Sequence, residues 1–278
     1  MTARETITFI NYLPLMIGDL IPENDKMWDL LIVLIKIIDV VMLPNITEIQ
    51  INSLKHLVSK HNSLYMQLFN EPLKPKFHFL LHYPSAIRKC GPLKNLWCMR
   101  FEGLHKQFKN PAKATNSRVN ISFTLAVKAG LKFSNTLVTE KFFETDLIFD
   151  EKHITLCNLQ LMYKEIIRNS IDLDLSQARC TQTLKFRGKT YKKHFFLTKS
   201  NTQPVLLYEI EQIILHNSEL YFLCRQWPIN HFSEHYQAYI TYKHTNIFSL
   251  HFIQEFDGPP IHLHHLKDGA KALRLKIN

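Results

Sequence analysis

The sequence predicts an α+β protein in which a helical N-terminal part precedes a β-rich C-terminal part. The first half repeats apolar residues at helical spacing, and short runs of β-branched and aromatic residues follow after Thr181. The chain has only seven glycines and carries no dinucleotide-binding or P-loop glycine pattern, which argues against a glycine-looped nucleotide fold. We expect a helical region over 1–112, a helical connector over 113–175, a barrel-like domain over 176–262 and a tail over 263–278.

Two helices are expected first. Apolar residues from Trp28 to Met42 recur at helical spacing, and Pro44 closes the run. Thr47 is suited to cap a second helix, because its hydroxyl can accept a backbone N–H of the first turn. Apolar residues continue the helical repeat as far as Leu68, so this helix is predicted to end before Glu71 and Pro72.

Prolines and a glycine divide the following segment. Residues 78–83 are expected to form a short helix or an extended segment, with Pro84 fixing its exit. Gly91-Pro92 predicts a turn, and residues 96–109 predict a third helix. Further helical pieces are expected near 122–132 and 150–169, after a polar connection over 110–120.

The C-terminal part predicts an antiparallel sheet. Strands are expected over 184–191, 194–198, 204–215, 219–227, 236–242 and 247–252. His216-Asn217-Ser218 separates two alternating runs, which indicates a hairpin. Short strands at close spacing favour a small barrel, and this part resembles the SH3-like and BAH-like barrels of chromatin proteins.

Positive charge is concentrated in two parts of the chain. The net charge is +10, and residues 71–143 hold 13 Lys or Arg against 3 Asp or Glu. Residues 175–278 hold 13 against 7. Such a field favours polyanions, nucleic acid first, and the alternative is a solvated basic face without a dedicated partner.

The cysteines and the longest apolar run suggest a protein of a reducing compartment without a membrane span. The five cysteines are scattered and never spaced as CxxC, which indicates neither a disulfide framework nor a zinc knuckle. The first 20 residues lack the order of a signal peptide. The run from Met27 to Leu43 is short for a membrane span and contains charged residues, so we interpret it as a buried helix.

Histidines are the remaining candidates for metal ligands. His78 and His82 are four residues apart, as are His231 and His235, and three more histidines cluster over 262–265. None has a Cys or carboxylate at a familiar ligand spacing, and the metalloprotease and serine-hydrolase motifs are absent, so structural histidines are favoured.

One stretch has a recognisable pattern. Residues 81–109 read LHYPSAIRKCGPLKNLWCMRFEGLHKQFK, and the later stretches FRGKTY and YFLC lie in the β-rich part. These motifs resemble the C-terminal region of CACTA-type (En/Spm) DNA transposases, in the variant found in animal elements. The close resemblance covers 74–109, and a looser likeness extends over about 17–250.

The resemblance implies a lineage with an RNase H-like catalytic domain that uses three acids and two metal ions for strand transfer. Glu102 resembles the third acid, but the family's first two acids lie upstream of the region matched here. Aspartates 19, 25, 29 and 39 are interpreted as helix-end or helix-surface residues. Gly103-Leu104 also replaces the usual Ala-Lys. We therefore expect a chain without catalytic activity or cofactor of its own, with Mg²⁺ relevant only if a complete catalytic domain is supplied.

The expected activity is nucleic-acid binding by a transposase-derived fragment or domesticated remnant located in the nucleus. The basic residues expected to contact nucleic acid in the first part are Arg88, Lys89, Lys94, Arg100, Lys106 and Lys109. Those expected in the second part are Lys185, Arg187, Lys189, Lys192 and Lys193, within a strip that runs from Arg179 to Lys199 without an acid.

Two alternatives stay open. One is a protein-interaction module of a transposase or chromatin complex, and the other is a split enzyme whose Glu102 completes a two-metal site in trans. The aromatic residues Tyr191, Tyr208, Tyr221, Phe222, Trp227 and Tyr239 suit either a cation or peptide site or a barrel core, and the core is favoured.

Overall fold

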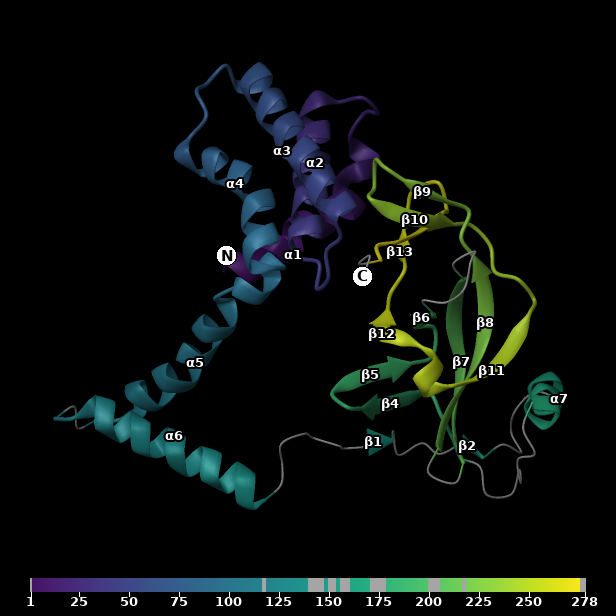
Figure 1. Cartoon of the computed structure of the whole chain (residues 1–278). Helices are drawn as coiled ribbons and strands as arrows, with labels where there is room; N and C mark the ends of the chain where they lie inside the picture. The colour runs from purple at the N-terminus through teal and green to yellow at the C-terminus, as the bar shows by residue number, and fades with distance from the viewer. Residues whose placement is uncertain are drawn as a thin grey trace. The chain divides into compact units, whose positions relative to one another are not determined.

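The computed structural model describes residues 2–116, 119–139, 148–149, 154–155, 161–170, 179–199, 206–216 and 219–275. Helices come first and antiparallel sheets follow, which confirms the α+β prediction (Figure 1). The chain divides into a helical unit, Met1–Thr139 with Glu234–Gln237 and Arg274–Asn278, and a β unit, Glu140–Ser233 with Ala238–Leu273. No described helix has the length and apolar character needed to cross a membrane.

The helical unit contains six α-helices and two short 3-10 helices in its described residues. They are α1 (Ala3–Ile17), η1 (Gly18–Leu20), α2 (Lys26–Val41), α3 (Glu48–Phe69), α4 (Pro75–Cys90), η2 (Leu93–Leu96), α5 (Met99–Ala114) and α6 (Ile121–Val138). Side chains cap the first turns: Asp25 accepts the N–H of Trp28, and Thr47 forms a capping box with Gln50. The prediction of Thr47 as a helix cap is confirmed, and α2 and α3 match the first two expected helices.

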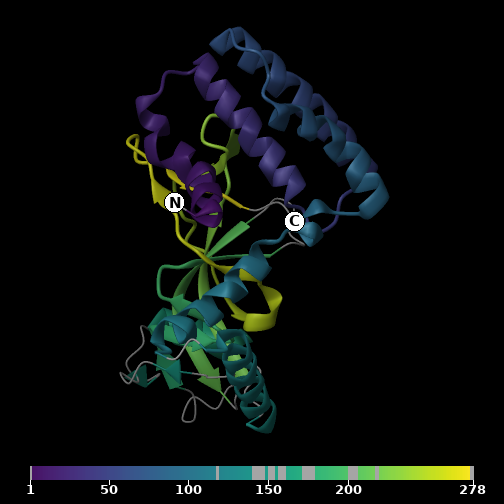
Figure 2. The same ribbon diagram turned by 90° about the vertical axis from the view of Figure 1, so that its left-hand side faces the viewer.

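Helices α2, α3 and α4 enclose one core of the helical unit, and α2 and α3 lie side by side in both views (Figure 1, Figure 2). Its buried residues are Val33, Ile37, Ile51, Leu54, Val58 and Ile87. A second cluster gathers around Trp28, whose indole N–H donates to the carbonyl of His235 at 3.1 Å. The turn Glu234–Gln237 therefore packs as part of this unit, and Tyr236 donates to Asp19 within it.

The prediction that Pro84 ends its segment is wrong. Helix α4 continues through Pro84 to Cys90, and the proline is buried. Residues flanking Pro84, above all Ile87, pack into the core, so burial outweighs the hydrogen bond that proline removes. The expected turn at Gly91 is present, because its φ of 78° ends α4, and the third expected helix begins at Met99 rather than residue 96.

The β unit contains one α-helix and short strands in its described residues. They are β1 (Ile148–Phe149), β2 (Ile154–Thr155), α7 (Leu161–Ser170), β3 (Arg179–Thr181), β4 (Thr183–Phe186), β5 (Lys189–Lys192), β6 (Phe196–Thr198), β7 (Leu206–His216), β8 (Glu219–Pro228), β9 (His231–Ser233), β10 (Ala238–Thr241), β11 (Phe248–Phe252), β12 (Asp257–Ile261), β13 (His264–His265) and β14 (Lys271–Leu273), with η4 (Ile253–Glu255) before β12. Part of the helix expected over 150–169 is thus strand β2, and the rest is described only from Leu161.

The strands form open antiparallel sheets. Their orders are β1-β4-β5, β13-β14-β10-β9 and β11-β8-β7-β3-β2, and β6 pairs with both β7 and β12. The pairings of the described residues close no barrel. The expected hairpin is confirmed by the pairing of β7 with β8, whose register places His216 opposite Glu219. Residues 263–278 contain strands β13 and β14.

The hairpin of β7 and β8 forms the centre of the β unit. Its residues are buried on both faces, with Ile210, Ile213 and Phe222 in one cluster and Ile214 and Leu223 in another. The core interpretation is confirmed for five of the six aromatic residues named above, because Tyr191, Tyr208, Tyr221, Phe222 and Trp227 are buried. A register shift between Ile210 and Gln212 places an extra residue, Glu211, in β7.

Candidate nucleic-acid interface

A tight hairpin presents the basic strip of the β unit. Strands β4 and β5 pair with Phe186 opposite Lys189, which leaves Arg187 and Gly188 as a two-residue turn. Both turn residues have positive φ, 48° and 70°, as a type I′ turn requires. The prediction of one strand over 184–191 is therefore wrong: the Arg-Gly pair folds it back on itself.

One face of this hairpin alternates hydroxyl and ammonium groups. The register places Lys185 opposite Thr190 and Thr183 opposite Lys192, so these four side chains share a face. Leu184 and Tyr191 point to the other face and are buried. We call the set Thr183, Lys185, Thr190 and Lys192 the hairpin face. Among the described residues, no carboxylate lies within ion-pair distance of Lys185 or Lys192.

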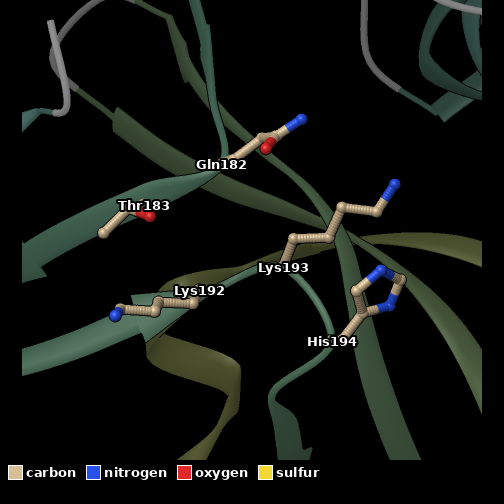
Figure 3. Close-up of a pocket in the computed structure, with 5 residues that line it drawn as sticks. All are labelled: Gln182, Thr183, Lys192, Lys193 and His194. Carbon is tan, nitrogen blue, oxygen red and sulfur yellow. The ribbon is translucent and has the colours of Figure 1, made fainter. Parts of the chain in front are cut away.

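An open pocket of about 420 Å³ lies where β5 ends. It is lined by Gln182, Thr183, Lys192, Lys193 and His194. Figure 3 shows Thr183 and Lys192 extending along the hairpin, whereas Lys193 and His194 extend to the other side. Every lining residue is polar or basic, so the pocket suits an anion.

A buried carboxylate orients the pocket histidine. The Nδ1 atom of His194 lies 2.8 Å from Oε1 of Glu209, and the indole N–H of Trp227 donates to Oε2 at 2.8 Å. The side chain of Glu209 is 10% exposed and that of His194 is 63% exposed. His194 also has a φ of 68° and donates its backbone N–H to the carbonyl of Ile210. The imidazole therefore turns Nδ1 to the protein and leaves Nε2 on the open side.

Lys193 is partly neutralised. Its ammonium lies 3.6 Å from Oε2 of Glu211, and Arg225 binds the other oxygen of that carboxylate at 2.7 Å. The bulge in β7 explains this arrangement, because the extra residue is buried next to two cations. Lys193 thus contributes less free charge to the pocket than Lys192 does.

Lys199, the last residue of the basic strip, has a largely buried side chain inside the β unit. Its ammonium is 5.2 Å from the ring centroids of Tyr208 and Phe256, 2.8 Å from Nδ1 of His251 and 2.5 Å from a carboxylate oxygen of Glu255. The three rings stand at steep angles, 67° to 81°, to one another. Burial and the Lys199 charge lower the pKa of His251, against the opposing effect of Glu255. The Lys199 ammonium therefore interacts with aromatic rings and a carboxylate of the β unit itself.

The other basic residues of the strip are exposed. Arg187 stacks its guanidinium 5.1 Å from the ring centroid of Phe186, and Lys189 donates to the carbonyl of Gly258 at 3.1 Å. Arg179 lies on β3, between β7 and β2. Arg187 and Lys189 are exposed, and each makes one weak contact that water can replace. Both cations therefore remain available to a large anion.

In the helical unit, the predicted contacts separate into paired and exposed residues. Arg88 binds Glu48 and also donates to Asn52 at 3.1 Å, and this pairing lowers the pKa of Glu48. Lys89, Lys94 and Lys109 are exposed on α4, η2 and α5. Arg100, Glu102 and Lys106 belong to α5, but their side chains lie outside the described residues.

No group of three or more His, Cys, Asp or Glu side chains that could hold a metal ion occurs in the described ranges. His78 and His82 approach each other at 3.0 Å between their Nε2 atoms, and His235 contacts the carbonyl of Gly18. Burial raises the pKa of the Cys180 thiol to about 12 and that of Cys224 well above its ordinary value. These two thiols are therefore unsuited to act as nucleophiles.

Sequence reasoning missed His194 and Glu209 as site residues. They are 15 positions apart, and their contact depends on the left-handed backbone of His194 and on the register of β6 with β7. The available signal was the pair of acids Glu209 and Glu211 in an otherwise largely apolar strand, because a buried acid demands a partner.

Comparison of the chain with protein-family models, with curated proteins and with solved structures gave no match.

Proposed function

We propose that the protein binds nucleic acid through its phosphate backbone, with the hairpin face as the principal contact in the β unit. The observation that carries this proposal is the arrangement of Lys185 and Lys192 on one exposed face, next to Thr183 and Thr190, without a carboxylate partner among the described residues. Lysine ammonium and threonine hydroxyl groups are common donors to phosphate oxygens. A β-hairpin holds the backbone of these residues at fixed spacing, so little backbone order has to be gained on binding.

Charge supports the same function in the helical unit. Lys89, Lys94 and Lys109 are exposed in the part of the chain with the largest excess of positive residues. Arg88 is assigned to packing of α4 against α3, because its guanidinium is bound to Glu48 and Asn52. Each unit then contributes its own phosphate contacts.

The motif of residues 81–109 supports a transposase lineage. We propose a fragment or domesticated remnant of a CACTA-like transposase, whose helical part derives from the late portion of an RNase H-like region and whose β unit derives from an SH3-like or BAH-like domain. Binding DNA in the nucleus follows from that lineage and needs no metal ion. Strand transfer would require the acids and Mg²⁺ of a complete catalytic domain.

A second candidate function is a protein-interaction module. It is favoured by the apolar face of α6, where Phe123 is 66%, Val127 43% and Leu131 66% exposed. These residues follow one another at helical spacing and share one side of the helix. Such a face is typical of helices that pack against another protein.

Fluorescence anisotropy with a short labelled duplex, measured over a salt series, tests these candidates. A phosphate binder loses affinity steeply as salt rises, with a slope of about −0.9 for each phosphate contact. Salt-independent or absent binding would favour the interaction module. In that case, replacing Phe123 and Leu131 by Asp should abolish capture of a partner.

A further inference from the structure

We propose that His194 is a proton-dependent phosphate contact. Its imidazole, positioned by Glu209, donates Nε2–H to a phosphate oxygen held in the pocket at the end of β5. The inference rests on the proposed function, because the phosphate is that of the bound nucleic acid. It adds a property that the lysines alone do not give: binding takes up a proton.

The backbone of His194 is held in a conformation that aims the ring. A φ of 68° is uncommon for a residue with a side chain, although His adopts it more readily than most. The 2.7 Å hydrogen bond from its N–H to the carbonyl of Ile210 stabilises this conformation. The outlier lies at a pocket, where strained residues are concentrated in functional proteins.

Glu209 acts as a positioning residue. Its two carboxylate oxygens have separate donors, Nδ1 of His194 on one and the indole of Trp227 on the other. Because Trp227 is buried, the carboxylate plane is fixed, and the imidazole is fixed with it. Because Nδ1 faces Glu209, Nε2 is the ring nitrogen that is left to meet a phosphate oxygen.

The charges around His194 explain why its protonation matters. Lys193 is paired with Glu211, which is also bound by Arg225, so these three groups leave a local charge near +1. Glu209 offsets that charge, and protonation of His194 restores it at the atom that faces the open side. The titratable and charged groups facing His194 from the packed elements are Lys192 on β5, Lys193 in the turn, Glu209 and Glu211 on β7, and Arg225 on β8, with His262 against the neighbouring Phe195.

The test measures binding of the full chain to a short duplex with 5′-hydroxyl ends at about pH 6, 7 and 8 and constant ionic strength. We expect the wild-type affinity to fall roughly threefold to tenfold between the lowest and highest pH, below the limit of tenfold per pH unit for one linked proton. His194→Asn should remove most of this dependence. Asn adopts the left-handed backbone and can donate to Glu209, so the variant keeps the fold while lacking a titratable group.

His231→Gln is the matched control, because His231 is an exposed histidine on β9, away from the pocket lining. It should retain the wild-type pH profile. Glu209→Gln should flatten the profile while leaving Lys185 and Lys192 in place, and near-ultraviolet circular dichroism of the aromatic residues checks that the core survives. A purely structural role for Glu209 would alter stability and leave the pH profile unchanged.

The outcomes separate this inference from the proposed function. If the wild type and His194→Asn bind with the same pH profile and the same steep salt dependence, the proton-linked contact is overturned and nucleic-acid binding stands. If the wild type shows no salt-dependent binding, the proposed function fails as well. A second duplex with 5′-phosphate ends decides the phosphate source: a pH effect that is confined to this duplex and is lost in His194→Asn assigns the site to a terminal phosphate.

Discussion

The Nδ1 atom of His194 lies 2.8 Å from Oε1 of Glu209, a buried carboxylate whose other oxygen accepts the indole N–H of Trp227. This contact connects the surface of the β unit to its core. A carboxylate with little solvent access needs hydrogen-bond donors at both oxygens. The Trp227 indole is a neutral donor, and the His194 imidazole is a donor that is charged when protonated.

Trp227→Phe should destabilise the β unit by about 1–3 kcal/mol, because it leaves Oε2 of Glu209 buried without its donor. Urea unfolding followed by circular dichroism measures the change. The matched control is Tyr242→Phe, which removes an exposed hydroxyl and should stay within about 0.5 kcal/mol of the wild type. Equal unfolding free energies for the two variants would contradict the role assigned to the indole.

Replacement of glycine by alanine should change the stability in opposite directions at Gly188, in the two-residue turn, and at Gly130, in α6. Gly188→Ala should destabilise by about 1 kcal/mol, because its φ of 70° is strained for a side chain. Gly130→Ala, in the middle of α6, should stabilise by about 0.5–1 kcal/mol. A Cβ at either position meets no atom within 4 Å, so only the backbone conformation separates them. Thermal unfolding gives the comparison, and a shift of the same sign in both variants would count against the type I′ turn.

The sequence predicted the helices and the central hairpin because their signals are local. Thr47 caps α3 through a residue three positions on, and the alternating runs on either side of residues 216–218 pair as expected. The turn at Arg187-Gly188 was not predicted from the sequence. In the structure both residues adopt the positive φ of a type I′ turn. Pro84 was overinterpreted, because burial of α4 decides its length.

The candidate site was predictable in part. Lys185 and Lys192 were expected from the run of basic residues, and their shared face follows once the turn is known. The ion pairs of Lys193 with Glu211 and of Lys199 with Glu255 were not predictable, because the partners are distant in sequence. Basic composition locates a region, whereas tertiary pairing decides which cations remain exposed.

Acid should destabilise the protein through His251. Burial lowers the pKa of this histidine from 6.5, so the unfolded chain binds its proton at a higher pH than the folded chain does. Stability is therefore expected to fall as pH drops below about 6.5, through the window between the unfolded and folded values. Thermal unfolding from about pH 7.5 to 5.5 measures the effect. His251→Asn should weaken this pH dependence, and an unchanged dependence in that variant would exclude His251 as its source.

Arg88 and Lys89 should differ in DNA binding although they are adjacent. Lys89→Ala should weaken binding and reduce the salt slope by about 1, as expected for one lost phosphate contact. Arg88→Ala should leave the salt slope unchanged and loosen α4 from α3, because its guanidinium binds Glu48 and Asn52. The reverse result, with the larger slope change in the Arg88 variant, would mean that the ion pair opens on binding.

Salt-dependent binding of duplex DNA by the double variant Lys185→Ala/Lys192→Ala measures the phosphate contacts of the hairpin face. Lys128→Ala/Lys243→Ala provides the control, since it removes the same charge from two exposed lysines outside the hairpin face. The hairpin variant should lose roughly 1.8 from the magnitude of the slope of log affinity against log salt, whereas the control should keep the wild-type slope. Equal slopes for the two double variants would contradict a phosphate-binding role for the hairpin face.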